Sequence, residues 1–170
     1  MRTRLIAVVG NGGDLTADQA QLAESLGAAL VEAGYGVVCG GLGGVMEAVA
    51  RGAVTGRGAA RHPPVVGILP YYVAEQGNDY LDIVLPTGLG HARNVLVAAA
   101  GEVVICIGGA AGALSEVALA RKIGRPVLAF PASGGTADLA AKALSSVISV
   151  ATPAEAVGRI RELLGPALRA

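Results

Sequence analysis

The sequence predicts an α/β fold, an open parallel sheet of about six to seven strands with helices on both faces. Short β-branched runs alternate with longer helical stretches along nearly the whole chain. The runs are almost continuously apolar, as expected of strands that are buried on both faces. The composition, 53% hydrophobic residues with 26 glycines and 3% aromatics, suits closely packed layers of small side chains. No linker or repeat divides the 170 residues, so we expect one domain.

The first β-α unit carries the clearest local signals. Residues 4–10, RLIAVVG, form the first apolar run. Thr16 and Gln19 have the spacing of a capping box, and Gly34 supplies a stop for the helix that follows. The next strand, GVVCGG at 36–41, leads into a helix at 44–54. This order predicts two neighbouring parallel strands joined by a helical crossover.

The same alternation continues to the end of the sequence. Glycine and arginine are frequent in residues 56–64, which we expect to form a loop. A helix is expected at the start of the tail that begins at Thr136, and the last helix should begin at Thr152 and Pro153, a cap followed by a helix-starting proline. The remaining strands are expected at 65–70, 80–87, 102–109, 125–130 and near 147–150, with helices at 91–100 and 112–124.

Charge and cysteine content narrow the possible functions. Thirteen Lys and Arg balance thirteen Asp and Glu, so no global field attracts nucleic acid or an anionic membrane, and we expect neither as a partner. Cys39 and Cys106 lie in apolar runs without C-x-x-C spacing, which favours buried core residues over metal or redox groups. No apolar run reaches the roughly 20 residues that span a bilayer, and a signal-peptide pattern is missing. We therefore expect a soluble, unprocessed, cytoplasmic protein.

Three of the expected strands end in glycines, at VVGNGG (8–13), CGGLGG (39–44) and IGGAAG (107–112). The carboxyl ends of parallel strands share one edge of a sheet, so the three loops should face one cleft. Glycine lets backbone amides approach a ligand, and the helix that follows adds partial positive charge, so each loop is a candidate phosphate cradle. None matches a Walker loop or the G-x-G-x-x-G pattern. Tight β-α turns alone would also explain the glycines.

Three motifs together resemble a known family. GGLGGVMEAVARGA (40–53), TGLGHARNVLV (87–97) and GGAAGALSE (108–116) are similar to the molybdenum-cofactor-carrier-like proteins. That family is a branch of the Rossmann-like group that includes the LOG enzymes, which are cytokinin riboside 5′-monophosphate phosphoribohydrolases. The resemblance covers roughly residues 4–130 and implies a Rossmann-like nucleotide-binding fold, so we expect a single domain of this kind over residues 1–170. With the three loops it gives the expected ligand contacts Gly10, Asn11, Gly40, Gly41, Gly43, Gly44, Met46, Glu47, Gly108, Gly109, Gly112 and Ala113.

The match to the LOG enzymes also implies two catalytic positions, Arg93 and Glu116. Glu116 could alternatively be a first-turn surface residue and Arg93 part of a surface salt bridge. The sequence departs from the enzymes at Gly108-Gly109-Ala110 in place of Pro-Gly-Gly, at Ala113 in place of a Thr whose hydroxyl would meet a phosphate, and at Asn94 in place of Lys. One hydrogen bond to the phosphate is therefore missing, although the backbone amides of the loop could still hold the anion.

Two functions remain open. We favour a homo-oligomeric protein, a dimer or tetramer, that binds a phosphate-bearing small molecule, either a nucleotide or a phosphorylated pterin such as the molybdenum cofactor, and requires no further cofactor or metal. The alternative is a phosphoribohydrolase, in which Arg93 holds the ribose phosphate and Glu116 stabilises the oxocarbenium charge or orients water. Lysine decarboxylase chemistry finds no support, because both lysines lie in expected helices away from the glycine loops. The roles of His91 and of Tyr71, Tyr72 and Tyr80 stay open.

Overall fold

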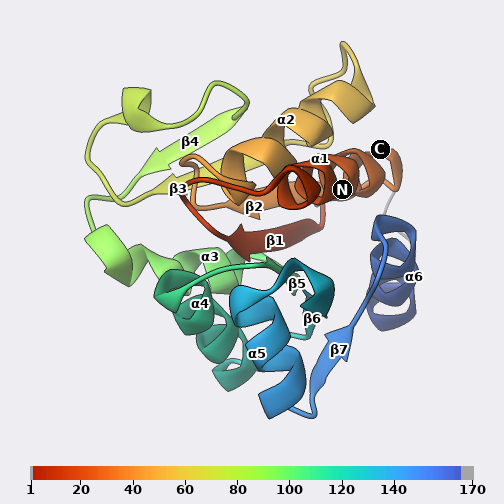
Figure 1. Ribbon diagram of the computed structural model, residues 1–170. Helices are drawn as coiled ribbons and strands as arrows, with labels where there is room; N and C mark the ends of the chain where they lie inside the picture. Colours follow the sequence, from red (N-terminus) through yellow and green to blue (C-terminus); the bar gives the residue numbers. More distant parts are fainter. Residues whose placement is uncertain (1, 166–170) are drawn as a thin grey trace.

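A computed structural model describes residues 2–165. Its centre is a seven-stranded sheet with the order β4-β3-β2-β1-β5-β6-β7, in which every neighbouring pair is parallel (Figure 1). The predicted open parallel sheet is therefore confirmed. The strands are β1 (Leu5–Gly10), β2 (Gly36–Cys39), β3 (Val65–Leu69), β4 (Ile83–Pro86), β5 (Val103–Ile107), β6 (Val127–Phe130) and β7 (Val147–Ser149).

Helices cover both faces of the sheet, as the alternating pattern predicts. In β1, Ile6 and Val8 pack into the core formed with α1, α2 and α6, whereas Ala7 and Val9 pack into the core formed with α3, α4 and α5. The period of two along the strand places successive side chains on opposite faces. Figure 1 shows the two helical layers on either side of the sheet. The helices are α1 (Ala17–Glu32), α2 (Val45–Arg57), α3 (Asn94–Ala100), α4 (Ala111–Lys122), α5 (Gly135–Ala143) and α6 (Pro153–Leu164).

The direction of the crossovers reverses between β1 and β5. The chain first moves outward from β1 through β2 and β3 to β4 at one edge, then returns to pair β5 with the other side of β1. The three glycine-rich loops thus follow three adjacent central strands, β2, β1 and β5. Ligands bind at such a reversal in open α/β sheets, outside the carboxyl ends of the strands.

The structure shifts several predicted boundaries. The expected helix at 91–100 is a 3-10 turn over Gly90–Arg93 followed by α3, and the expected strand at 80–87 is the shorter edge strand β4. Two further 3-10 turns, Ala74–Gln76 and Pro131–Ser133, were not predicted. Helix α2 runs two residues into the expected loop. Its last residue, Arg57, makes two hydrogen bonds of 2.6 and 2.8 Å to the Asp82 carboxylate, which ties the end of α2 to the segment before β4.

The predicted capping box of α1 is present. The Thr16 hydroxyl accepts a hydrogen bond from the Gln19 amide at 3.1 Å, and the Gln19 side chain accepts one from the Thr16 amide at 3.2 Å. Thr16→Ala should lower the free energy of unfolding by about 1 kcal/mol, because one helix donor loses its partner. Urea denaturation will measure the loss, and Thr16→Ser, which keeps the hydroxyl, should stay close to the wild type. An unchanged Thr16→Ala midpoint would contradict this role.

Candidate functional site

A cavity of about 190 Å³ lies at the carboxyl ends of the central strands, where the fold places its ligand crevice. Strand β1, the loop after β2, the turn before α3 and the first turns of α4 all contribute to its wall. Segments far apart in the sequence therefore meet here. The residues that line the cavity are Val8, Val9, Gly10, Gly12, Gly40, Leu42, Met46, His91, Arg93, Asn94, Gly112, Ala113 and Glu116.

Arg93 is a buried cation in this cavity, with 8% of its surface exposed. Its Nη1 atom donates to the Asn94 side-chain oxygen at 2.5 Å and to Glu116 Oε1 at 3.4 Å, and its Nη2 atom donates to the Gly40 carbonyl at 3.5 Å. Its Nε atom has no hydrogen-bond partner among the described residues. Surface salt bridging is thus not the role of Arg93, since the guanidinium is held inside the protein.

Glu116 is the buried anion that faces Arg93. The carboxylate is 6% exposed, and burial raises its pKa from 4.5 to about 7 although the Arg93 guanidinium acts in the opposite direction. Desolvation penalises the charged form, and one hydrogen bond at 3.4 Å does not compensate for it. Glu116 therefore stays close to its protonation midpoint at neutral pH, a property common at functional sites.

Gly40 makes room for the Arg93 side chain. A Cβ atom at Gly40 would overlap the Arg93 guanidinium and would lie 2.7 Å from the Met46 sulfur. A glycine is needed here for close approach, and not for an unusual backbone angle, because its φ is not positive. The glycine motif after β2 therefore positions the buried cation, which is a role distinct from phosphate binding.

A second cavity of about 320 Å³ adjoins the first one at the amino-terminal end of α4. It shares Gly10, Gly12, Gly112 and Ala113 with the inner cavity and is also lined by Asn11, Gly13, Asp14 and Ala110. The first helical hydrogen bond of α4 runs from the Leu114 amide to Ala110, and no side chain caps this helix. The amides of the first turn have no acceptor within the helix and can bind an anion.

Half of the twelve predicted ligand contacts line the two cavities. The Gly108 amide donates to Ser133 Oγ and the Gly109 amide to Asn11 Oδ1, both at 2.7 Å, so these two amides are already used within the protein. Glu47 instead pairs with Arg51 at 3.4 Å. The predicted contacts that line neither of the two cavities are Gly41, Gly43, Gly44, Glu47, Gly108 and Gly109.

Several lining residues were not predicted as contacts. His91 lines the inner cavity and, with Tyr71, a neighbouring cavity of about 170 Å³. Asn94 holds Arg93 and donates to Ser115 Oγ at 2.8 Å. The motif GLGHARN contains both residues, but its spacing could not show that both face the glycine loops. The apolar residues Val8, Val9 and Leu42 carry no sequence signal that separates them from core residues.

The three tyrosines noted in the sequence do not form one cluster. Tyr71 borders the cavity beside His91. Tyr72 is 83% exposed, and its ring lies against Gly88. Tyr80 lies on another part of the molecule, with the Arg51 guanidinium 5.7 Å from its ring centre. Only Tyr71 is therefore placed to contact a ligand that extends out of the inner cavity.

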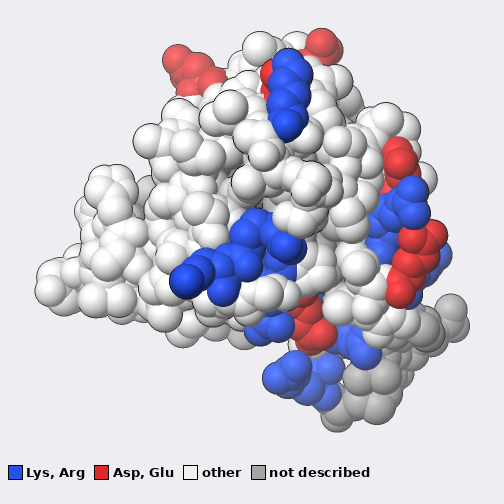
Figure 2. All heavy atoms as spheres, turned by 90° about the horizontal axis from the view of Figure 1, so that it is seen from below, with Lys and Arg blue, Asp and Glu red and all other residues white. Residues whose placement is uncertain are grey.

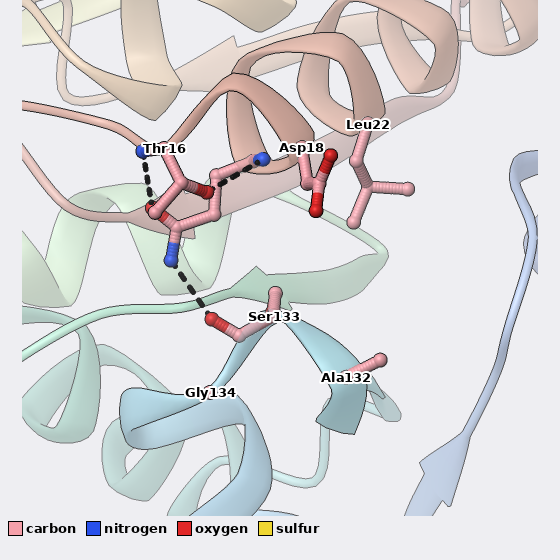
Figure 3. Close-up of a pocket in the computed structure, with 7 residues that line it drawn as sticks. Thr16, Asp18, Leu22, Ala132, Ser133 and Gly134 are labelled. Atoms are coloured by element: carbon pink, nitrogen blue, oxygen red, sulfur yellow. Dashed lines mark hydrogen bonds between the residues drawn. The ribbon is translucent and has the colours of Figure 1, made fainter.

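A larger cavity of about 420 Å³ separates the start of α1 from the turn before α5 (Figure 3). The Gln19 side chain bridges the two segments. Its amide group donates to the Ser133 carbonyl at 2.8 Å and accepts from the Thr16 amide. The Ser133 hydroxyl is likewise used, since it donates to the Phe130 carbonyl at 2.6 Å. These polar groups join two parts of the scaffold, so the cavity at Arg93 and Glu116 remains the candidate functional site.

Within residues 2–165, no three His, Cys, Asp or Glu side chains are grouped as a metal site. Over the same residues, no helix combines the length and the apolar character that crossing a bilayer requires. Cys39 and Cys106 are buried, as predicted, and burial raises the pKa of Cys39 to about 11 and that of Cys106 to about 12.

The fold and the site define a Rossmann-like α/β protein with a small-molecule cavity at its topological switch point. The sequence model of the SLOG cluster4 family matches residues 3–157, and the chain belongs to that family. A relative, an uncharacterized protein of Archaeoglobus fulgidus, is 39% identical over 127 residues, which are 75% of this chain and 80% of the relative.

Solved structures agree with this assignment. The molybdenum cofactor binding protein of Rippkaea orientalis is 32% identical, with a TM-score of 0.85 over 96% of this chain and 99% of that chain. The molybdenum cofactor carrier protein of Chlamydomonas reinhardtii is 29% identical, with a TM-score of 0.80 over the same shares of the two chains. The resemblance to carrier-like proteins drawn from the three motifs is confirmed.

Proposed function

We propose that this protein binds a phosphorylated pterin, the molybdenum cofactor in the first place, and holds it without chemical change. The observation that carries the proposal is the pair of adjoining cavities at the switch point. The outer cavity offers the unpaired amides of α4, and the inner one offers Arg93 and Glu116. Similarity to proteins that bind or carry this cofactor, over almost the whole chain, supports the same ligand class.

The site fits such a ligand in its general chemistry. A phosphate is bound well by backbone amides at a helix amino terminus. A flat ring system needs a narrow space with small side chains on its walls, and four glycines line the inner cavity. The molybdenum would travel as part of the cargo, so the protein itself need not supply metal ligands. The residues that would hold the ligand are those of the first turn of α4, Arg93 and Glu116.

Native mass spectrometry tests the proposal directly. Protein purified from cells that synthesise the molybdenum cofactor should retain a mass that corresponds to a phosphorylated pterin, with or without molybdenum. The Arg93→Met variant, purified in the same way, should retain much less, because the buried cation of the cavity is lost. Wild-type protein that retains no pterin, and that binds none when the purified cofactor is added, would contradict the proposal.

The hydrolase hypothesis makes a different prediction for nucleotides. Purified protein incubated with AMP, GMP and CMP should release little free base, because Ala113 offers no hydroxyl to the phosphate of a LOG-type substrate. Chromatography of the free bases measures the release. Robust release that disappears in Glu116→Ala would overturn the carrier proposal and establish a phosphoribohydrolase.

A further inference from the structure

We propose that the inner cavity selects rings with a 2-amino-4-oxopyrimidine edge, the edge shared by pterins and guanine, and that Glu116 recognises this edge. The inference rests on the proposed function and assigns a specific orientation to the ligand. The ring enters the inner cavity, and the phosphate remains in the outer cavity at the start of α4.

Unused hydrogen-bonding capacity at the buried pair is the first observation. In the part of the chain that the structure describes, Glu116 accepts only the 3.4 Å hydrogen bond from Arg93, and this bond uses Oε1. The Arg93 Nε atom has no hydrogen-bond partner among the described residues. Both side chains are more than nine-tenths buried. Buried charged groups with spare donors and acceptors call for a ligand that supplies the complementary groups.

The shape of the cavity is the second observation. Gly10, Gly12, Gly40 and Gly112 line the space of about 190 Å³, while Leu42 and Met46 add apolar surface. A Cβ atom at Gly40 would overlap the Arg93 guanidinium and lie 2.7 Å from the Met46 sulfur, so this wall depends on glycine. Walls without side chains leave a narrow space with a carboxylate, and a flat heterocycle that presents polar atoms at its edge fits such a space.

The third observation is that the hydrogen-bonding groups on the ring edge are complementary to the Glu116 carboxylate and the Arg93 guanidinium. A 2-amino-4-oxopyrimidine ring presents two adjacent N–H donors, and the two oxygens of a carboxylate can accept both in parallel. The carbonyl oxygen beside these donors can accept from a guanidinium, which Arg93 supplies. Adenine presents a ring nitrogen lone pair in place of the central donor, so its edge would repel the Glu116 carboxylate.

The connection between the cavities explains how one molecule can reach both ends of the site. The inner and outer cavities share Gly10, Gly12, Gly112 and Ala113. Ala113 is in the first turn of α4 and Glu116 in the second, so the anion-binding amides and the carboxylate belong to one helix. A ligand with a ring at one end and a phosphate at the other therefore needs no rearrangement of the loops.

Calorimetric titration with GMP, IMP and AMP tests the inference, because the three share ribose and phosphate but differ at the ring edge. At pH 8 we expect the affinity order GMP, IMP, AMP, with GMP bound at least about tenfold more tightly than AMP. Glu116→Gln should remove most of this preference, since an amide offers one acceptor in place of two. Glu32→Gln, at an exposed position of α1, is the matched control and should keep it.

The possible outcomes separate this inference from the proposed function. Equal affinity of the wild type for the three nucleotides would overturn the selectivity for the 2-amino-4-oxopyrimidine edge, while the phosphate site and the proposed function would stand. Binding of none of the three would overturn the selective site. The proposed function would then be tested only by the pterin that the purified protein retains in native mass spectrometry. Circular dichroism of Glu116→Gln will confirm that a lost preference reflects the ring contact and not unfolding.

Discussion

Glu116→Gln should be more stable than the wild type above pH 7 and nearly equal to it below pH 4.5. Burial raises the pKa of Glu116 from 4.5 to about 7. The native state therefore binds this proton more tightly than the unfolded state does, and stability is lost as the pH rises through this interval. The loss at pH 8 should be on the order of 3 kcal/mol, and glutamine, which does not ionise, should avoid it.

The other ionisable groups at the cavity do not produce the same dependence of stability on pH. The pKa values of Cys39 and Cys106, raised by burial to about 11 and about 12, keep both thiols neutral over the range. Arg93 is the cation that faces Glu116. His91 lines the same cavity, so the comparison is repeated in a His91→Asn background to separate its contribution.

Urea denaturation at intervals between pH 4.5 and pH 8 measures the effect. The free energies of unfolding of wild type and Glu116→Gln should diverge steadily as the pH rises. Glu32→Gln, exposed on α1, should follow the wild type throughout. Parallel curves for wild type and Glu116→Gln would show that the folded protein accommodates the charged carboxylate without cost, against the expectation from its burial.

Substitutions on the exposed surface of α3 and α4 should separate a dimer into monomers. Val95, Leu96 and Leu114 are 39%, 39% and 40% exposed. These two helices pack together in the layer that also contains α5. Apolar side chains gathered on one surface usually mark an interface, and a two-fold dimer is the simplest way to cover it. We therefore predict a homodimer through α3 and α4.

Charge on the same side of the molecule limits where the two-fold axis can lie. Figure 2 shows this side as mostly uncharged, with Lys and Arg gathered near its centre. Arg121, Lys122 and Arg125, around the end of α4, form no ion pair within the described part of the chain. Two copies of this cluster would repel each other across an axis. The axis should therefore pass closer to Leu96 and Leu114.

Light scattering at micromolar concentration tests the dimer. The wild type should give at least twice the chain mass of 16.7 kDa. Leu96→Asp combined with Leu114→Asp should weaken association by about a hundredfold or more, since each buries a carboxylate in an apolar contact. Leu163→Asp, at a 42% exposed position of α6 on the other face, should have no effect. A wild-type monomer would refute the interface.

The sequence by itself determined the fold class and the order of the elements. Apolar β-branched runs alternate with helical stretches, and this alternation requires parallel strands with helical crossovers. The capping box at Thr16 and Gln19, and the cap at Thr152, fixed two helix starts correctly, because a cap is a local hydrogen-bond pattern. Arg93 and Glu116 were predicted from their positions in the motifs, and in the structure Arg93 Nη1 lies 3.4 Å from Glu116 Oε1.

Only the tertiary structure decided which loop amides are free and which charges are buried. The sequence predicted that the Gly108 and Gly109 amides contact a ligand. In the structure they donate to Ser133 and Asn11, which come from distant segments. Glu47 and Glu116 both lie near helix starts, yet Glu47 pairs at the surface and Glu116 is enclosed. Burial and pairing depend on segments brought together across the sheet, and a local pattern of residues does not contain that information.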